Sequence, residues 1–418
     1  MNKSSISIDP LLIDHKKIGK KLKLFIFSNN VGQGLPMWLP KGVILRKNLE
    51  NFLSKIQQKF GYEMIITPHI GSKKLYITSG HWSKYGQDSF QPIKTPDKNE
   101  EFIIKPMNCP HHCEVYKYQQ WSYKDLPKRF AEFGTVYRYE QSGELQGLTR
   151  TRCFTQDDAH IFCTENQLFE EFQKVIDLIL NMFKYLEFSK YTVRISLRDP
   201  KKKNYYLGTE QNWNKAEKYI LEIVKAKKLD FITHYGEAAF YGPKLDFLVQ
   251  DSLNRNWQLG TIQIDYNLPE RFNLCYIGKN NDKCRPVMIH RAPFGSIERV
   301  LSIIIEHTQG NFPLWLSPDQ VVIIPISEKY IIYAKKILNL MLNLNIRVFI
   351  DTRNEKMDKK IRDSEENKIP YMIILGNKEE KNKMLSLRRH GIGALGVFSI
   401  DNGINIIFKE TNKITKLL

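Results

Sequence analysis

Apolar residues recur along the first half of the chain with the spacing of helices that bury one face. From Leu45 to Phe60 they follow one another at intervals of three and four residues, and Gly61 ends the run. A second run follows Thr164, where Gln167 three residues later completes the capping-box pattern of a helix start. The pattern therefore predicts two long helices, each with one buried face.

The segments between and after these helices have strand-like composition. They occupy about Phe102–Met107, Phe130–Glu140 and Cys153–Phe162, and a further group extends over Phe231–Leu268. The segment Ser296–His307 again has a helical pattern. Strands in succession with helices around them are typical of an antiparallel sheet in an α+β domain.

The order of the elements changes near Ser317. From there strands and helices alternate, which indicates a separate, small α/β domain of about 100 residues. The sequence thus predicts a domain boundary between residues 316 and 317. The expected strands are Val321–Ile326, Arg347–Ile350 and Tyr371–Leu375, and the expected helices are Lys329–Leu344 and Lys356–Asn367.

Composition narrows the class of protein. Of the 418 residues, 42% are hydrophobic and 26% are charged, as in a folded protein of two or three domains. No apolar run approaches the roughly 18 residues of a membrane span, and the N-terminal residues lack the apolar segment of a secretory signal. Six cysteines are too few for a disulfide framework in a chain of this length. We therefore expect a cytoplasmic protein without a membrane segment.

The charge of the chain is strongly positive. Lys and Arg number 63 and Asp and Glu number 45, so the formal net charge is 63 − 45 = +18. An excess of this kind is typical of proteins that bind nucleic acid. A codon composition that favours Lys, Asn and Ile would produce the same excess, and the count alone leaves both explanations open.

The segment Phe154–Phe162 has the clearest pattern for chemistry. Because alternate residues of a strand share a face, an aromatic ring, an amide, a carboxylate and an imidazole would lie in line. Such a set is costly to bury unless it binds something, although a solvent-facing strand is the alternative. A second predicted strand has a similar but less specific polar face. The two faces comprise Phe154, Gln156, Asp158 and His160, with Asp157 on the reverse side, and Thr261, Gln263 and Asp265.

The segment Cys109–Cys113 contains two cysteines and two histidines, which are preferred zinc ligands. It lacks the paired spacing of a structural zinc site, so a complete local site is not predicted. One ligand from this segment could combine with distant residues such as His160 and His290, a question that spacing does not settle.

Arginines flank a glycine-containing loop. Arg138 shares a strand face with Glu140, and Arg150 and Arg152 follow the loop. Guanidinium groups bind phosphate through two parallel hydrogen bonds. These arginines could equally be solvated, or paired with Glu140 and Glu144.

Several segments together resemble a known family. Gly61–Pro68, Phe133–Glu140 and Ala292–Arg299 resemble, in order and spacing, the three motifs of class II aminoacyl-tRNA synthetases. The resemblance extends from about Asp14 to the C-terminus. It implies an antiparallel-sheet catalytic domain with a short N-terminal extension in residues 1–316, and an anticodon-binding α/β domain in residues 317–418. Four segments look more narrowly like the threonyl-tRNA synthetase family: Lys105–Pro110, Phe154–Phe162, Phe240–Lys244 and Met288–Ala292.

The resemblance makes Cys109, His160 and His290 the ligands of one zinc ion per subunit. Three protein ligands leave open positions, as in a working zinc site. By similarity, the amino and hydroxyl groups of L-threonine occupy them, which rejects valine, a near isostere that an apolar pocket excludes poorly. The residues expected to line the amino-acid pocket are Met107, Gln156, Asp158, Tyr241, Gln258, Thr261, Gln263 and Ser296.

The family pattern assigns a second set of residues to ATP, which binds with Mg²⁺. The threonine carboxylate would attack the α-phosphorus to form threonyl-adenylate, and the tRNA ribose would then attack the adenylate. His81 resembles the histidine implicated in activating that ribose. The expected contacts are Arg138 on the α-phosphate, Glu140 and Phe154 on adenine, Arg299 at the γ-phosphate, and Arg150 and Lys244 as further phosphate or adenylate contacts.

By resemblance, the C-terminal domain binds the anticodon of tRNA(Thr). Asn354, Glu379 and Arg388 match its base-reading positions. Lys368 stands where an arginine is common, and lysine cannot supply the bidentate fork. The family forms dimers around the segment at Pro68, so we expect a homodimer.

The chain also departs from the family in two places. Long bacterial relatives carry N-terminal domains, one of which hydrolyses serine wrongly joined to the tRNA, whereas this chain opens only a few residues before the catalytic core. We therefore expect a short form that makes Ser-tRNA and cannot clear it, because serine also offers an amino group and a hydroxyl. His111 and His112 follow Pro110, and we interpret them as packing residues.

Two other classes of protein remain as alternatives. A non-catalytic tRNA-binding paralogue would usually lose motif arginines or metal ligands, whereas Arg138, Arg299 and Cys109 are present. A zinc hydrolase built on Cys109–Cys113 would lack an evident general base beside the cluster.

Overall fold

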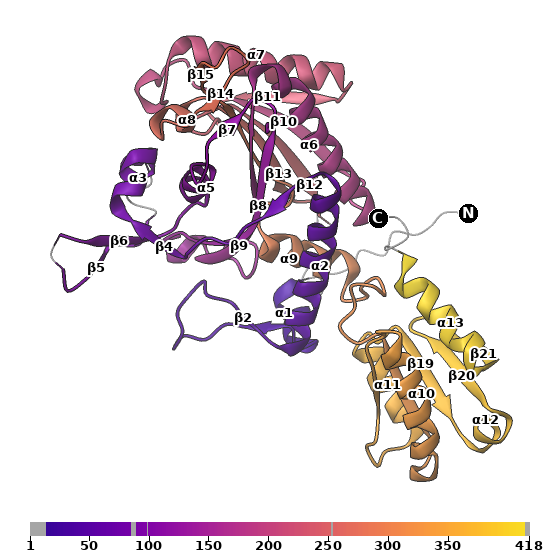
Figure 1. Ribbon diagram of the computed structural model, residues 1–418. Helices are drawn as coiled ribbons and strands as arrows, with labels where there is room; N and C mark the ends of the chain where they lie inside the picture. The colour runs from indigo at the N-terminus through magenta and orange to yellow at the C-terminus, as the bar shows by residue number, and fades with distance from the viewer. Residues whose placement is uncertain (1–13, 85–88, 98, 252–253, 414–418) are drawn as a thin grey trace. The chain divides into compact units, whose positions relative to one another are not determined.

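The computed structural model describes residues 14–84, 89–97, 99–251 and 254–413 (Figure 1). The described residues divide into two compact units, which we call the large unit (27–36 and 53–302) and the small unit (14–26, 37–52 and 303–413). The division falls within two helices, α2 (Pro40–Lys59) and α9 (Ile297–Thr308). The boundary expected between residues 316 and 317 stays a prediction.

The large unit is built on an eight-stranded sheet. From one edge to the other its strands are β11 (Phe231–Tyr235), β10 (Tyr191–Leu197), β12 (Lys244–Gln250), β13 (Asn256–Asp265), β16 (Val287–Ala292), β9 (Cys153–Cys163), β8 (Lys128–Tyr137) and β3 (Glu63–Met64). The two outermost pairs, β11 with β10 and β8 with β3, are parallel, and all the other neighbours are antiparallel. The predicted antiparallel α+β architecture is confirmed.

Helices pack on both faces of this sheet. On one face lie α6 (Glu165–Tyr185), which contacts β9, β13 and β16, and α7 (Glu210–Ala226), which contacts β10 (Figure 1). The start of α6 has the predicted cap, because the Thr164 backbone N–H donates to Gln167 Oε1 at 2.9 Å. On the other face, α5 (Cys109–Tyr116) and α8 (Asn267–Arg271) share a core with Phe130 and Phe162.

The remaining elements of the large unit are short. Two three-stranded sheets, ordered β4-β6-β5 and β15-β14-β7, flank the main one. These elements are β4 (Ile70–Ser72), α3 (Lys73–Ser79), α4 (His81–Lys84), β5 (Ile93–Lys94), β6 (Glu101–Ile104), β7 (Trp121–Ser122), β14 (Tyr276–Ile277), β15 (Lys283–Cys284) and the 3₁₀ turns η2 (Ser142–Glu144) and η3 (Lys203–Tyr205).

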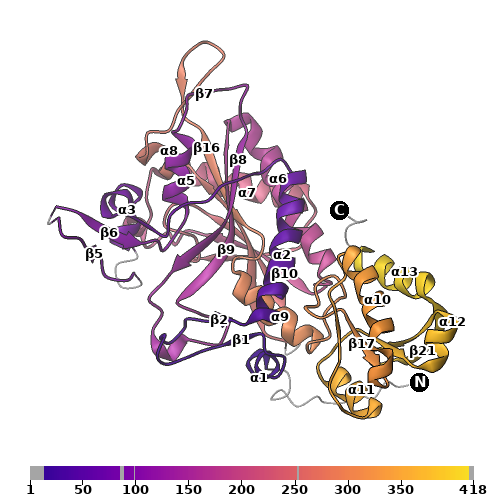
Figure 2. The same cartoon turned by 60° about the horizontal axis from the view of Figure 1, so that its bottom comes forward.

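The small unit contains a five-stranded sheet, ordered β18 (Val348–Ile350), β17 (Val321–Pro325), β19 (Tyr371–Leu375), β20 (Met384–Arg389) and β21 (Gly393–Ser399). The first three strands are parallel and the last two are antiparallel. Helices α10 (Ile331–Asn343) and α13 (Ile400–Thr411) cover one face, and α11 (Met357–Glu366) covers the other (Figure 2). The alternating order predicted for this part of the chain is confirmed.

Five further elements complete the small unit. They are α1 (His15–Lys21), β1 (Phe25–Ile26), β2 (Met37–Trp38), η4 (Glu328–Tyr330) and α12 (Asn377–Asn382), of which β1 and β2 form a two-stranded sheet. Within the described ranges of both units, none of the helices has the length and apolar character that a bilayer crossing requires.

Candidate active site and metal centre

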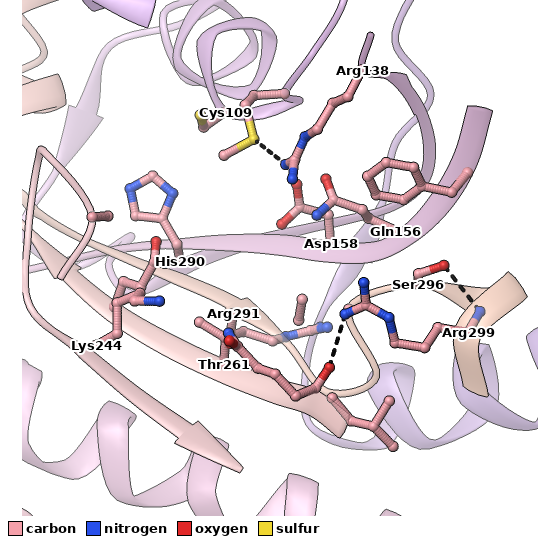
Figure 3. Close-up of a pocket in the computed structure, with 18 of the residues that line it drawn as sticks. Cys109, Arg138, Gln156, Asp158, Lys244, Thr261, His290, Arg291, Ser296 and Arg299 are labelled. Atoms are coloured by element: carbon pink, nitrogen blue, oxygen red, sulfur yellow. Dashed lines mark hydrogen bonds between the residues drawn. The ribbon is translucent and has the colours of Figure 1, made fainter. Parts of the chain in front are cut away.

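A cavity of about 370 Å³ lies on the α5 side of the main sheet in the large unit (Figure 3). The predicted alternation of β9 is borne out, because its polar face borders the cavity while Asp157 lies on the reverse side, where it accepts hydrogen bonds from the backbone of Phe294 and Gly295. Every residue expected to contact threonine, ATP or zinc lines this cavity: Met107, Cys109, Arg138, Glu140, Arg150, Phe154, Gln156, Asp158, His160, Tyr241, Lys244, Gln258, Thr261, Gln263, His290, Ser296 and Arg299.

The pairing register gathers these side chains from distant parts of the sequence. His160 of β9 lies opposite His290 of β16, His290 lies opposite Gln263 of β13, and Gln263 lies opposite Lys244 of β12. Residues opposed in this way project from the same face of a sheet. The four side chains therefore form one row across the floor of the cavity, and the Tyr241 hydroxyl donates to Gln263 Oε1 at 2.6 Å.

Cys109, His160 and His290 form a buried cluster whose ligand atoms all lie within 4.8 Å of one another. Each imidazole is held from outside the cluster. His290 Nε2 lies 2.8 Å from Asp265 Oδ2, and His160 Nδ1 lies 2.8 Å from His112 Nδ1. The two remaining nitrogens, His160 Nε2 and His290 Nδ1, face each other at 3.0 Å. The structure therefore brings together three groups that spacing alone could not connect.

The positions of the protons in this cluster leave lone pairs that a metal cation could bind. His290 donates its Nε2–H to Asp265, so its Nδ1 atom carries a lone pair that points at His160. Burial, together with His112 and His290, lowers the pKa of the His160 imidazole well below its ordinary value. Burial also raises the pKa of the Cys109 thiol, which metal binding would deprotonate. Two imidazole nitrogens and a thiol in a buried site are a donor set that zinc prefers.

The lining of the cavity is cationic. The Arg138 guanidinium lies 5.2 Å from the centroid of the Phe154 ring and donates to Met107 Sδ at 3.0 Å. Arg299 donates to two backbone carbonyl oxygens, those of Thr149 at 3.0 Å and Gln258 at 3.1 Å. This surplus of charge suits a phosphate group. The charged lining residues are Arg138, Arg150, Lys244, Arg291 and Arg299 against Glu140 and Asp158.

Arg150 is paired within the protein. Its Nε donates to Glu140 Oε2 at 2.8 Å, and its Nη2 lies 3.3 Å from Glu144 Oε2. The pairing that the sequence left as an alternative to phosphate binding is therefore present. The expected contacts of Arg150 and Glu140 with ATP stay predictions.

Gln156 and Asp158 supply acceptor oxygens beside the metal cluster. Gln156 Oε1 is buried and has no hydrogen-bond partner within the described part of the chain. Asp158 Oδ2 accepts from Asn108 Nδ2 at 3.1 Å, and burial raises the pKa of this carboxyl. Gly134 makes room for Asn108, because a Cβ there would lie 2.4 Å from Asn108 Nδ2. These oxygens could accept hydrogen bonds from a ligand amine.

Asp246 was not predicted as a site residue. This fully buried carboxylate on β12 accepts from Gln258 Nε2 at 2.8 Å and from Thr261 Oγ1 at 2.9 Å, and it lies 3.4 Å from Lys244 Nζ. It therefore fixes three lining side chains at once. The sequence feature that could have identified Asp246 is a carboxylate between two apolar residues in the middle of a strand.

His112 was interpreted from the sequence as a packing residue, and the structure adds hydrogen bonds that this interpretation did not include. Its ring is fully buried and hydrogen-bonded on both sides, to His160 and to Glu132. Burial opposes ionisation of Glu132, but the hydrogen bond from His112 and the charge of Lys105 outweigh it and lower the pKa of Glu132 to about 2. His111 differs, since its ring packs against Tyr76 and its Nδ1 has no partner among the described residues.

His81 is buried and is not among the residues that line the cavity. Its Nδ1 lies 2.8 Å from Ser79 Oγ, and its Nε2 lies 3.6 Å from Cys109 Sγ. The ring packs against Phe240 and Tyr241. Its expected role toward the tRNA ribose stays a prediction.

The anticodon residues expected in the small unit occupy both ends of its sheet. Asn354 follows β18 and Glu379 lies in α12 after β19, so both are at the carboxyl edge of the parallel strands. Lys368 precedes β19, at the opposite edge. Glu379 accepts from Ser386, which shares a face of β20 with Arg388. Base reading by these residues stays a prediction.

Two family descriptions match the chain. Residues 91–308 match the tRNA synthetase class II core domain (G, H, P, S and T), and residues 320–410 match the anticodon binding domain. The class II resemblance noted in the sequence is confirmed.

Known proteins resemble the chain over nearly its whole length. A threonine–tRNA ligase of Flavobacterium johnsoniae is 62% identical over 406 residues, which cover 97% of this chain and 63% of that protein. The crystal structure of the RNA binding domain of a Cryptosporidium parvum threonyl-tRNA synthetase matches with a TM-score of 0.89 and 38% identity, covering 94% of this chain and 97% of that one. A putative threonyl-tRNA synthetase of Aeropyrum pernix matches with a TM-score of 0.81 and 28% identity, covering 96% and 97%. The chain spans between 61% and 63% of the length of the curated relatives.

Proposed function

The chain belongs to the threonyl-tRNA synthetase family of class II tRNA synthetases, and on this basis we propose that it attaches L-threonine to tRNA(Thr) in an ATP-dependent reaction. The observation that carries the proposal is a single cavity in which a thiol and two imidazoles lie close together and arginines line the wall. The part of the cavity beside the thiol and the imidazoles suits an amino acid with a polar side chain. The part lined by arginines suits a nucleoside triphosphate.

We propose zinc as the ion held by Cys109, His160 and His290, with one ion per subunit. The buried thiol and the two facing lone pairs support this assignment. When bound, the ion supplies coordination positions that an amine and a hydroxyl can fill, which excludes valine for want of a hydroxyl.

The residues of the chain would orient the two substrates for adenylate formation. Gln156 Oε1 and the Asp158 carboxylate would accept hydrogen bonds from the threonine amine. Arg138 and Arg299 would hold the phosphates of ATP, which enters with Mg²⁺. A carboxylate oxygen of threonine then attacks the α-phosphorus, and the bond to the departing pyrophosphate breaks. The fixed guanidinium charges stabilise the negative charge that develops at phosphorus.

Threonine-dependent ATP–pyrophosphate exchange tests this activity directly. The zinc-loaded protein should exchange with threonine at a kcat/KM about 10,000-fold above that with valine, because a site built to bind a hydroxyl rejects the analogue that lacks it. A non-catalytic paralogue would bind tRNA without exchange, and a zinc hydrolase would show neither. Absence of threonine-dependent exchange from the zinc-loaded protein would overturn the proposal.

We expect the 418-residue polypeptide, assayed by itself, to form Ser-tRNA and to leave it intact. Serine offers the same amine and hydroxyl, and the missing methyl group is worth only about 1–3 kcal/mol, or roughly 10- to 200-fold. The two matched families are a synthetase core and an anticodon-binding domain. Charging with radiolabelled serine, followed by deacylation with and without the protein, checks this. Protein-dependent hydrolysis of Ser-tRNA would contradict it.

We propose that the protein is a homodimer joined at β3. This strand is the edge of the main sheet; Met64 within it is 37% exposed, and Ile66 and Ile70 after it are 95% and 43% exposed. Ile66→Glu should shift the protein to monomers, because a charge would be buried at the interface. Light scattering measures the mass, and Ile93→Glu on β5 is the matched control at an exposed isoleucine away from β3. A dimer unaffected by Ile66→Glu would exclude this interface.

The anticodon-binding family match supports tRNA as the partner that the net charge of +18 suits. We propose Asn354, Lys368, Glu379 and Arg388 as its contacts in the small unit. A cytoplasmic location remains an expectation from the sequence.

A further inference from the structure

A chain of buried polar groups leads away from the proposed zinc ligand His160. His160 Nδ1 lies 2.8 Å from His112 Nδ1, and His112 Nε2 lies 3.2 Å from Glu132 Oε2. Glu132 Oε1 accepts from the Thr67 backbone N–H at 2.7 Å and lies 3.5 Å from Lys105 Nζ. All five residues are at most 5% exposed. Buried networks of this kind fix the direction of each hydrogen bond.

The donors around Glu132 determine where the protons of this chain lie. Its carboxylate accepts from the Thr67 N–H and hydroxyl, and the Thr67 hydroxyl accepts from Lys105 Nζ at 2.9 Å. His112 Nε2 therefore donates to Glu132, and in the neutral form of the ring this leaves a lone pair on His112 Nδ1. His160 Nδ1 must then donate to that lone pair. The lone pair of His160 is thereby placed on Nε2, the atom that faces His290.

We propose that His112 and Glu132 are positioning residues that hold His160 in the tautomer and ring orientation needed to bind zinc through Nε2. The inference rests on the proposed zinc site. Histidine ligands of metals commonly donate their second N–H to a fixed acceptor, which orients the ring. His290 has such an acceptor directly in Asp265, whereas His160 is linked to its carboxylate through a second imidazole. The hydrogen-bonded chain from His160 through His112 and Glu132, which we call the relay, ends at Thr67. Thr67 lies in the segment that resembles the first class II motif.

Substitutions at His112 separate hydrogen bonding from packing. A glutamine can accept from His160 with Oε1 and donate to Glu132 with Nε2, whereas a phenylalanine fills the space and does neither. We expect His112→Phe to weaken zinc binding by about 10- to 100-fold, and His112→Gln to stay within about threefold of the unmodified protein. Glu132→Gln should also weaken binding, because its amide can donate to His112 and favour the opposite tautomer.

Two measurements report on the metal site without relying on activity. Competition with a chromophoric chelator gives the zinc affinity of the full chain. The visible absorption of the Co²⁺-substituted protein reports the geometry of the ligands. His112→Phe should alter these Co²⁺ bands and His112→Gln should restore them, whereas a purely structural role would change only thermal stability.

Glu171→Gln provides the matched control. Glu171 is a buried carboxylate that accepts from Arg129 of β8 at 2.6 Å and 2.8 Å and does not belong to the relay. We expect this variant to lose stability while keeping its zinc affinity and its Co²⁺ spectrum. If the unmodified protein fails to bind zinc, the proposed function is wrong. If it binds zinc and His112→Phe binds equally well with an unchanged spectrum, the positioning role alone is wrong.

Discussion

Replacing Cys109 with alanine should abolish stoichiometric zinc binding and remove most of the discrimination between threonine and valine. The thiol begins α5 and belongs to the buried cluster that it forms with His160 and His290 among the described residues, so its loss leaves two imidazoles whose lone pairs face each other. Discrimination should fall at least about 100-fold below its starting value of about 10,000-fold, because shape and apolar contacts distinguish near isosteres poorly. Zinc analysis and exchange kinetics with both amino acids measure the two effects.

Cys113→Ala is the control for this result. Cys113 lies on the same helix, is equally buried, and contacts Met288 Sδ at 3.9 Å, outside the cluster. This variant should keep its zinc and its preference for threonine. Normal zinc content in Cys109→Ala would show that the ion is held by other residues.

Replacing Arg138 with alanine is expected to lower kcat for ATP–pyrophosphate exchange by about 100- to 1,000-fold, with a smaller effect on KM for threonine. The guanidinium projects into the cavity between the Phe154 ring and Met107 Sδ, where the α-phosphate is proposed to bind. Its charge is worth more in the transition state than in the ground state, because negative charge develops at phosphorus. Exchange kinetics at saturating ATP separate kcat from KM.

Arg138→Lys tests whether charge or geometry matters more. Lysine keeps the charge but lacks the planar fork, so an intermediate loss is expected. Lys227→Ala is the control for the loss of a positive charge, because Lys227 pairs with Asp177 at 2.7 Å and does not line the cavity. If Arg138→Ala retains exchange within about threefold of the unmodified protein, the phosphate assignment is wrong.

Local pattern was enough to predict most of the fold. The capping residues at Thr164 and Gln167 and the apolar stripe after them located α6, and the alternation in β9 separated Asp157 from the polar face. These features depend on residues a few positions apart in sequence, which helix and strand periodicity reveal directly. The class II motifs then connected segments that periodicity leaves separate.

The residues that hold the lining side chains in place from behind the cavity could not be predicted from local sequence pattern. Glu132 faces Asp158 only because β8 pairs with β9, and Asp246 reaches Gln258 only because β12 pairs with β13. The periodicity of one strand shows which face a residue occupies, but it does not show which residue of another strand lies opposite it. His112 looked like a packing residue because its two partners come from β8 and β9, strands that lie 20 and 48 residues away in sequence.

The direct opposition of His160 and His290 has a consequence for studies of refolding. The two histidines are 130 residues apart and meet only when β9 and β16 pair in the native register. A slip of one residue would turn one of the two imidazoles to the reverse side of the sheet. Folds that depend on pairing between such distant segments form slowly. Capture of a spectroscopically visible metal ion during refolding would therefore time the closure of the central strands, independently of any catalytic assay.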